Sequence, residues 1–422
     1  MKIMVVGGGG REHAIIKKIK KSPLADEIFV LPGNAGMKND ATCVDIGAKD
    51  IDGIVSFAKE NAIDYAIVAP DDPLVLGAVD SLNEIGVPCF GPKANAAIIE
   101  GSKIFSKNLM KKYNIPTAKY EVFTDIDSAI AYLENESYPT VVKADGLALG
   151  KGVVIAMNKE EAIDAVRSMM EDRMFGDSGS RVVIEEFLTG PEVSVLAFTD
   201  GKSVVPMVSS MDHKRALDND MGLNTGGMGT IAPNPYYTSD IAEICMRDIF
   251  LPTINAMNEE GRTFKGCLYF GLMLTPNGPK VIEYNCRFGD PETQVVLPLL
   301  ESDLLKIMMA CTDGTLTSDM VKFSDGAACC VIMASGGYPK SYKNGFEITV
   351  KDGMTADIYF AGAKEVNGSL VTAGGRVLGV TAVEKDLASA INTAYENVKK
   401  VNFEGAHYRK DIGKRAMAAS KN

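Results

Sequence analysis

Short apolar runs alternate with amphipathic stretches over the first hundred residues of the chain. The apolar runs predict strands at 3–6, 28–31, 65–69 and 87–90, and the amphipathic stretches predict helices around 14–19, 54–58 and 74–85. The lysines at 17, 18, 20 and 21 fall late in the first helix, where the helix dipole favours them, and are interpreted as a solvated face. The alternation itself predicts a doubly wound parallel sheet covered by helices over residues 1–100.

The pattern changes after residue 100, where short strands and helices are interleaved. Predicted strands at 140–145, 153–156, 181–187 and 193–198, with helices at 126–134 and 160–170, indicate a small α+β lobe at about 120–190. Strands at 267–274 and 280–285 predict a hairpin around the turn at 276–278. We expect this central part to span 101–325.

The last part, 326–422, is rich in strands and ends in a helical stretch. Its predicted strands lie at 327–334, 348–350, 357–361 and 376–383. Because repeats and low-complexity linkers are absent from the sequence, the three parts should pack tightly against one another.

Composition excludes several classes of protein. The 422 residues are 46% hydrophobic and 23% charged, and the net charge of -11 argues against a nucleic-acid-binding surface. No apolar run approaches the roughly 18 residues of a membrane helix, and the start is too short for a signal peptide, so we expect a cytoplasmic protein without a membrane partner. Eight scattered cysteines and three histidines predict neither a zinc site nor a disulfide framework.

Two turns are candidate phosphate sites. The run GGGGREH at 7–13 follows a strand and opens a helix, so backbone N–H groups and the helix dipole can hold a phosphate there. Glu12 replaces the last glycine of a dinucleotide-binding GxGxxG, which leaves a phosphate-ester site and a merely structural turn as the open readings. The turn PGNAG at 32–36 lies at the same carboxyl edge of the predicted sheet.

A second glycine-rich segment, KADGLALGKGV at 143–153, joins two strands. Its glycines allow close approach to an anion, and Lys143 and Lys151 supply positive charge. It is not a P-loop, because a strand rather than a helix follows it. The alternative is a charged hairpin turn.

Acidic and amide side chains end two further strands. Glu185 and Glu186 close one strand, and Glu192 follows it, where backbone groups can bind an adenine edge and a carboxylate can bind ribose. In VIEYN, strand periodicity places Glu283 and Asn285 on one face, and both offer the oxygen that Mg²⁺ prefers.

A loop between DHKR at 212–215 and NTGGMG at 224–229 combines basic residues with three glycines. This composition is typical of an anion-binding segment. His213 is interpreted as a structural hydrogen-bonding residue.

Taken in order, these motifs resemble the phosphoribosylamine–glycine ligases, a family of the ATP-grasp superfamily. The resemblance runs through GGREH, PGNAG, EGSK, KADGLALGKGV, EEFL, DHKR, NTGGMG, VIEYNCRFGDPETQ, GGRVLGVTA and YRKDIG, and so covers essentially the whole chain. It implies a multidomain protein of α/β and α+β architecture. A Rossmann-like N-terminal domain would precede a central ATP-grasp fold with a small lid lobe, and a strand-rich C-terminal domain would follow.

The resemblance also implies a function and a set of site residues. Glycine would be joined to 5-phosphoribosylamine with ATP through glycyl phosphate, in purine biosynthesis, by a monomer or weak homodimer. Mg²⁺, or alternatively Mn²⁺, would be held by Glu283 and Asn285. ATP would contact Lys103, Lys143, Gly150, Lys151, Gly152, Glu185, Glu186, Phe187, Leu188, Glu192, Arg215 and Asn224. The phosphoribosyl group would contact Gly9, Gly10, Arg11, Glu12, Gly33, Asn34 and Gly36, and catalytic roles would fall to Asp212, Lys214, Arg287 and Asp290.

That chemistry needs charge neutralisation, positioning and exclusion of water rather than a protein nucleophile. Three positions depart from the family pattern: Gly8 where Asn or Ser is frequent, Asp71 and Asp72 where Pro-Glu is usual, and Leu223 in place of proline. Gly8 is expected to loosen the phosphate turn, and Leu223 to make the NTGGMG loop more mobile. The rivals are another ATP-grasp ligase or carboxylase, a non-catalytic nucleotide-binding protein, and an NAD-dependent dehydrogenase that rests on the glycine run alone.

Overall fold

The N-terminal part of the computed structural model is a five-stranded parallel sheet, as predicted. The structure describes residues 1–147, 152–172 and 179–419. The strand order is β3-β2-β1-β4-β5, with β1 at Lys2–Gly7, β2 at Glu27–Pro32, β3 at Thr42–Cys43, β4 at Tyr65–Val68 and β5 at Cys89–Phe90. The order reverses beside β1, and ligands of open α/β sheets bind outside the carboxyl ends of the strands at such a reversal. Both predicted phosphate turns lie at this edge, since Gly33 N donates to Gly7 O.

Helices cover this sheet, and one predicted helix is divided in two. Helices α1 (Gly10–Ile19) and α2 (Ile51–Glu60) match the prediction. The predicted helix 74–85 is wrong in detail, because α3 (Asp71–Val75) and α4 (Ala78–Glu84) are separated at Gly77, whose φ of +87° breaks the helix. The two-residue strand β3 was not predicted, since it is too short to show a period.

The predicted solvated face is confirmed for the exposed Lys20 and Lys21 but is wrong for Lys17 and Lys18, which are half-buried. Lys17 donates to Ile358 O and pairs with Asp357, while Lys18 donates to Leu300 O. The prediction failed because the partners lie far away in the sequence, on segments that pack over the end of the helix. Lys17 and Lys18 connect the N-terminal sheet to the rest of the molecule.

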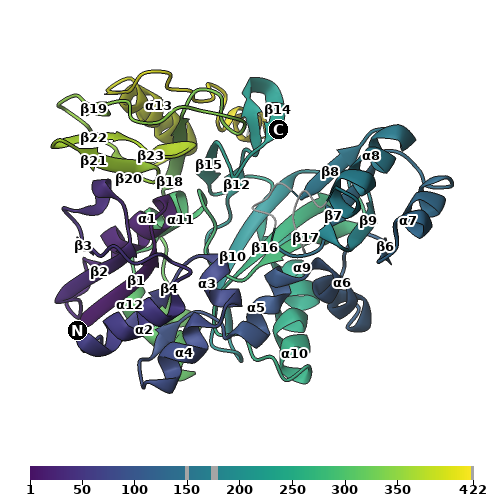
Figure 1. The fold of residues 1–422 in the computed structure, drawn as a ribbon, viewed down its shortest axis with the longest axis horizontal. Coiled ribbons are helices and arrows are strands. Elements are labelled where there is room, and N and C mark those ends of the chain that lie inside the picture. The colour runs from purple at the N-terminus through teal and green to yellow at the C-terminus, as the bar shows by residue number, and fades with distance from the viewer. Residues whose placement is uncertain (148–151, 173–178, 420–422) are drawn as a thin grey trace.

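A second body is the small lobe, a four-stranded antiparallel sheet of order β6-β9-β7-β8. Its strands are β6 (Tyr120–Phe123), β7 (Thr140–Ala144), β8 (Val153–Ala156) and β9 (Val182–Glu186). Helices α7 (Ile126–Leu133) and α8 (Lys159–Met170) share a buried apolar core with one face of it. The lobe stands out to the right of the molecule in Figure 1. The predicted strand at 193–198 belongs to the neighbouring sheet instead.

That neighbouring sheet has the order β11-β10-β16-β17. It contains β10 (Glu192–Thr199), β11 (Val204–Pro206), β16 (Gly266–Thr275) and β17 (Gly278–Asn285). Strands β16 and β17 form the predicted hairpin. Helices α5 (Ala94–Gly101), α6 (Lys103–Lys112), α9 (Ser239–Cys245) and α10 (Leu251–Glu259) accompany it.

The C-terminal sheet draws strands from two parts of the chain. Its order is β12-β15-β18-β23-β20, with β12 at Met211–Asp212, β15 at Gly229–Ala232, β18 at Ala327–Ala334, β20 at Asp357–Phe360 and β23 at Arg376–Glu384. The helix α13 (Leu387–Val398) packs on β18 and β23, while α11 (Thr293–Leu299) packs on the sheet from the side of α1. The expected boundary near residue 326 therefore falls inside one continuous sheet. The short pairs β19–β24 (Thr349–Val350, Val401–Asn402) and β21–β22 (Ala363–Val366, Ser369–Thr372) lie outside it.

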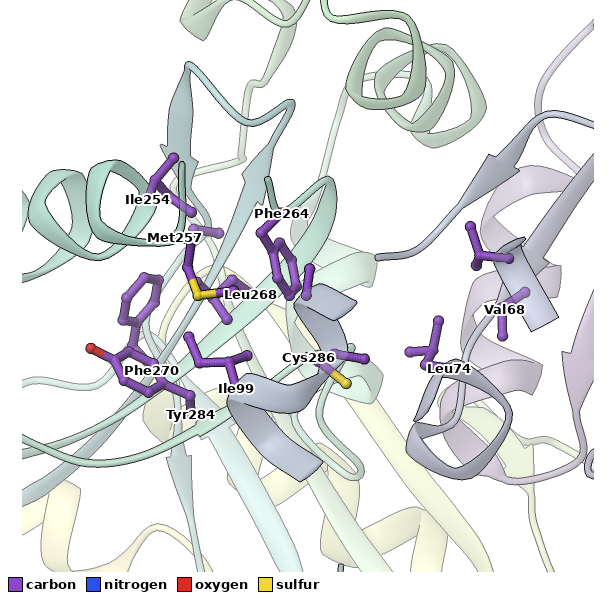
Figure 2. Packing of buried hydrophobic residues seen from close by; sticks show 14 of the residues in the cluster. Val68, Leu74, Ile99, Ile254, Met257, Phe264, Leu268, Phe270, Tyr284 and Cys286 are labelled. Atoms are coloured by element: carbon purple, nitrogen blue, oxygen red, sulfur yellow. The ribbon is translucent and has the colours of Figure 1, made fainter. Parts of the chain in front are cut away.

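Apolar side chains join these bodies. In Figure 2, Ile99 of α5 lies among Leu268 and Phe270 of β16 and Tyr284 of β17. The same buried cluster continues to Val68 of the N-terminal sheet. Burying this apolar surface stabilises the packing of the N-terminal sheet against the sheet that contains β16 and β17. No described helix has the length and apolar character needed to cross a bilayer.

Candidate active site

A bulge in the hairpin presents the predicted metal ligands. The pairing of β16 with β17 shifts at Ile282, which has no partner of its own. Simple alternation from the buried Val281 would turn Glu283 into the core, but the extra residue turns Glu283 and Asn285 to the other face. Gly271 lies opposite Glu283, and a β-carbon at Gly271 would come within 3.0 Å of the Glu283 side chain. The structure thus brings Glu283 and Asn285 together, as predicted.

Lys214 lies beside this pair. Its Nζ is 3.3 Å from Glu283 Oε1. The positive charge of Lys214 lowers the pKa of Glu283 to about 2, and Glu283 in turn raises the pKa of Lys214. Both groups are therefore charged at neutral pH, and Glu283 is a carboxylate available to a cation.

Lys143, on β7 of the small lobe, contacts the same bulge. Its Nζ donates to Ile282 O at 3.1 Å and lies 3.0 Å from Glu185 Oε1. The second oxygen of Glu185 is 2.9 Å from the buried Lys107, whose pKa burial lowers to about 8. Glu185 therefore bridges two lysines, so its side chain positions Lys143, which the sequence did not predict. Lys107 was missed, although its place four residues after Lys103 sets both on one face of α6.

The glycine-rich loop is fixed at its described ends. Lys103 Nζ donates to Gly146 O at 2.8 Å, and burial lowers the pKa of Lys103. Ala144 N donates to Gly152 O, which closes the base of the loop at 2.8 Å. The predicted contacts Gly150 and Lys151 lie outside the described residues.

The other predicted nucleotide contacts line the edge between the lid and the hairpin. Glu186 pairs with Lys280 of β17 at 3.0 Å, while Phe187 is exposed and Leu188 half-buried. Glu192 begins β10 and lines a small pocket together with Lys214, Ile282 and Glu283. A contact predicted for ribose therefore stands next to the proposed metal ligands.

Arg215 and Asn224 face each other across a separate hairpin of β13 (Arg215–Leu217) and β14 (Met221–Asn224). Arg215 donates to Gly222 O at 2.8 Å. Leu223 is an exposed residue of β14. The hairpin places Arg215 one residue beyond Lys214.

A second, acidic part of the pocket surrounds Asp212. Burial, and then the nearby charge of Glu292, raises the pKa of Asp212 well above its usual range. Glu292 is buried and accepts hydrogen bonds from Tyr269 Oη at 3.0 Å and from Ser194 Oγ at 3.3 Å. The buried hydroxyl of Thr230, directly opposite Asp212 on β15, has no hydrogen-bond partner among the described residues. Glu292 carried no predicted role, although it stands in the polar run after VIEYN.

Arg287 contacts one of the two predicted metal ligands. It donates to Asn285 Oδ1 at 3.2 Å and to Glu100 Oε1 at 2.9 Å. Glu100 also accepts from Cys286 N at 2.7 Å. These bonds fix the orientation of the Asn285 amide.

The two phosphate turns are in backbone contact. A β-carbon at Gly8 would lie 2.5 Å from Gly33 O, so glycine at this position permits the close approach instead of loosening the turn as expected. Asn34 donates to Gly8 O and receives a bond from Gly36 N, both at 2.9 Å. Glu12 is buried and accepts from Gly9 N at 2.7 Å, so it caps α1 and holds one of the donors predicted for phosphate.

Asp290 lies beside the turn at residues 9–12. Arg11 donates to Phe288 O at 3.1 Å, and Asp290 accepts from Gln294 at 2.8 Å and lies 3.4 Å from Arg376. A β-carbon at Gly9 would lie 3.3 Å from Asp290 Oδ2, and one at Gly10 would lie 2.6 Å from Gln294 Nε2. Arg376, in GGRVLGVTA, was not predicted as a site residue. The predicted phosphoribosyl residues thus adjoin Asp290, while Asp212 and Glu283 lie further toward the hairpin.

Within the described ranges, the acidic, cysteine and histidine side chains form no group of three that could hold a metal ion. Two oxygen ligands with phosphate oxygens in addition are, however, what Mg²⁺ typically uses.

Comparison with known proteins covers the same regions. Family models of phosphoribosylglycinamide synthetase match the chain as an N domain over 1–100, an ATP-grasp (A) domain over 101–293 and a C domain over 328–415. A phosphoribosylamine–glycine ligase of Haemophilus influenzae is 47% identical over 423 residues, covering 99% of each chain. That of Halalkalibacterium halodurans is 48% identical over 420 residues, covering 99% of this chain and 98% of the relative.

Solved structures agree with these matches. The crystal structure of phosphoribosylamine–glycine ligase from Thermotoga maritima gives a TM-score of 0.87 at 34% identity, covering 98% of this chain and 100% of the other. A biotin carboxylase domain from Hydrogenobacter thermophilus gives 0.75 at 16% identity, covering 96% and 91%. The second likeness shows a shared fold alone.

Proposed function

Because this chain belongs to the phosphoribosylamine–glycine ligase family, we propose that its charged site positions ATP, glycine and 5-phosphoribosylamine for ligation. The family reaction forms glycinamide ribonucleotide, ADP and phosphate in purine biosynthesis. One contact supports this assignment of residues most directly. Lys143 donates to the backbone of the bulge that presents Glu283 and Asn285. One cation from the lid and two oxygen ligands from the hairpin converge there.

We place the ATP phosphates between Lys103, Lys143 and Lys214. Lysine ammonium groups neutralise phosphate charge, and Lys214 lies beside Glu283 in the pocket that Glu192 also lines. Adenine would lie at the strand end 185–188, and Arg215 and Asn224 would approach the nucleotide from the other side. Gly150, Lys151 and Gly152 would cover the phosphates.

A divalent cation fits Glu283 and Asn285. Glu283 is ionised at neutral pH, and Asn285 Oδ1 retains a lone pair besides the one that accepts from Arg287. When bound there, such a cation would neutralise developing charge on the phosphates. We propose Mg²⁺, with Mn²⁺ as the alternative.

The acidic pocket suits the ammonium group of glycine. Asp212 and Glu292 are two carboxylates in one buried place, and the unpartnered Thr230 hydroxyl offers a further oxygen. A bound ammonium would offset the burial of Asp212 and its repulsion from Glu292, which together raise the pKa of Asp212. The glycine carboxylate would then point toward Lys214 and the ATP phosphates, while Asp290 and the turns at 9–12 and 33–36 would hold the phosphoribosyl group.

The reaction then needs two displacements. A glycine carboxylate oxygen bonds to the γ-phosphorus of ATP, the bond to the β,γ-bridging oxygen breaks, and ADP leaves. The amine nitrogen of phosphoribosylamine bonds to the carbonyl carbon of glycyl phosphate, the bond to the phosphate oxygen breaks, and the nitrogen loses a proton. Positioned charges and exclusion of water serve both steps.

We also propose the domain limits 1–100, 101–325 and 326–422, a cytoplasmic location, and a monomer or weak homodimer.

The experiment that tests the function is an ADP-release assay of purified protein with ATP, Mg²⁺, glycine and freshly generated phosphoribosylamine. ADP release should need both acceptors. Equal release without glycine or without the amine would overturn the ligase assignment.

A further inference from the structure

The segment 407–415 of the C-terminal part is bonded to residues 213–220, which include β13 and the tip of the β13–β14 hairpin. His407 lies 2.7 Å from Ala216 O, Lys410 N donates to Asp218 at 2.7 Å, and Gly413 N donates to His213 Nε2 at 3.1 Å. Yellow C-terminal segments appear beside β14 in Figure 1. Residues 213–220 are therefore tied to a segment almost two hundred positions later.

Arg409 stands at the centre of this contact. It is 1% exposed, and it donates to Arg215 O at 3.1 Å and to Asp220 at 3.0 Å. Its other nitrogens make two parallel bonds to Asp411, both at 2.8 Å. The guanidinium thus holds the backbone carbonyl of Arg215, and with it the position of the Arg215 side chain.

The same segment holds the tip of the hairpin. Asn219 and Asp220 have φ values of +57° and +55°, in the left-handed region that asparagine and aspartate adopt more readily than other residues with a β-carbon. Asn219 N donates to Asp411 Oδ2 at 2.8 Å, and Asp220 bonds to Arg409. These hydrogen bonds therefore stabilise the conformation of the tip.

We propose that Arg409 is a positioning residue for the nucleotide: by holding the backbone of Arg215, it makes the C-terminal domain part of the ATP site. The proposal rests on the proposed function, because Arg215 and Asn224 are assigned to ATP there. It adds that nucleotide affinity depends on a side chain whose hydrogen bonds to described residues all lie in the hairpin and in its own segment. Glycine, which we place against Asp212 and Glu292, and phosphoribosylamine, which we place at Asp290 and the N-terminal turns, should be affected less.

The test compares Arg409→Met and Asp220→Asn with Asn397→Ala. Asn397 is a buried residue of α13 that bonds Thr355 and Thr393 O, so its loss weakens the C-terminal domain without touching the hairpin. For each full-length variant, calorimetry measures the Kd of ADP with Mg²⁺, and steady-state kinetics give KM for ATP, KM for glycine and kcat. Thermal unfolding reports how far each domain is destabilised.

We expect Arg409→Met to raise the ADP Kd and the ATP KM by about tenfold, as loss of a charged hydrogen bond implies, with glycine KM within about twofold. Asp220→Asn should cause a smaller change in the same direction, and Arg409→Lys should restore part of the affinity. An unchanged ADP Kd in both Arg409→Met and Asp220→Asn, or an equal loss in Asn397→Ala, overturns the proposal. If Arg409→Met does not fold, Asp220→Asn decides on the same readouts. The ADP Kd is measured without either acceptor, so failure of the ligase assay and failure of this proposal are distinguishable.

Discussion

The ammonium nitrogen of Lys214 lies 3.3 Å from Glu283 Oε1, in the pocket between the acidic residues and the hairpin bulge. The charge of the lysine keeps Glu283 ionised down to a pH of about 2. A carboxylate in this state can bind a divalent cation at any physiological pH, and the lysine beside it can neutralise phosphate.

Replacement of Glu283 should therefore abolish turnover while leaving the fold intact. Glu283→Ala removes one of the two proposed metal ligands, and the half-exposed Lys214 that it leaves unpaired can be hydrated. The measurements are kcat and the thermal unfolding midpoint. Near-normal activity in the folded variant would sink the metal assignment.

Lys143→Ala should chiefly weaken nucleotide binding. The substitution removes a cation from the proposed phosphate site and also releases one oxygen of Glu185, whose other oxygen stays paired with Lys107. We expect KM for ATP to rise by about tenfold or more, since each lost charged contact contributes about 1.5–3 kcal/mol. An unchanged apparent affinity for ATP would contradict this role.

Gly8→Ser should impair the phosphoribosyl site. The new β-carbon would meet Gly33 O, so the two phosphate turns must move apart. KM for phosphoribosylamine should rise, while KM for ATP stays unchanged. Gly47→Ala is the matched control, because a β-carbon at Gly47 meets no atom within 4 Å. Equal KM values for phosphoribosylamine in the two variants would refute the prediction.

His213 should make stability depend on acid pH. Burial lowers the pKa of His213 from its ordinary value of 6.5 to about 4. Between these values the unfolded chain takes up a proton that the folded chain does not, so stability is lost as pH falls from 6.5 toward 4. The loss is at most about 3 kcal/mol. Urea unfolding from pH 7 to 4 should show a smaller loss for His213→Gln than for the unaltered protein, and equal losses would exclude the histidine as the cause.

Much of the fold follows from periodicity. Apart from β3 and β6, the strands of the N-terminal sheet, the lobe and the 267–285 hairpin were visible as local patterns, because their apolar residues repeat at the period of a strand or helix. The division at Gly77 and the joining of β15 to β18 were not visible. The first depends on one backbone angle, and the second on pairing across about a hundred residues.

The site residues could be predicted where residues with a shared role lie close together in the sequence. Glu283 and Asn285 are two residues apart, and both phosphate turns directly follow strands. Lys107 and Arg409 could not be assigned roles, because their meaning depends on Glu185 and Arg215, which only the folded chain brings near. The bulge at Ile282 is likewise a property of pairing, and it alone turns Glu283 away from the core.

The measurement closest to the central claim follows the oxygen atoms of glycine. With glycine labelled by ¹⁸O at both carboxylate oxygens, together with ATP, Mg²⁺ and phosphoribosylamine, the released inorganic phosphate is analysed by mass spectrometry. Attack of the carboxylate on the γ-phosphate predicts one ¹⁸O atom in each phosphate formed. Phosphate that carries no label, while glycinamide ribonucleotide accumulates, would contradict activation of glycine as its acyl phosphate.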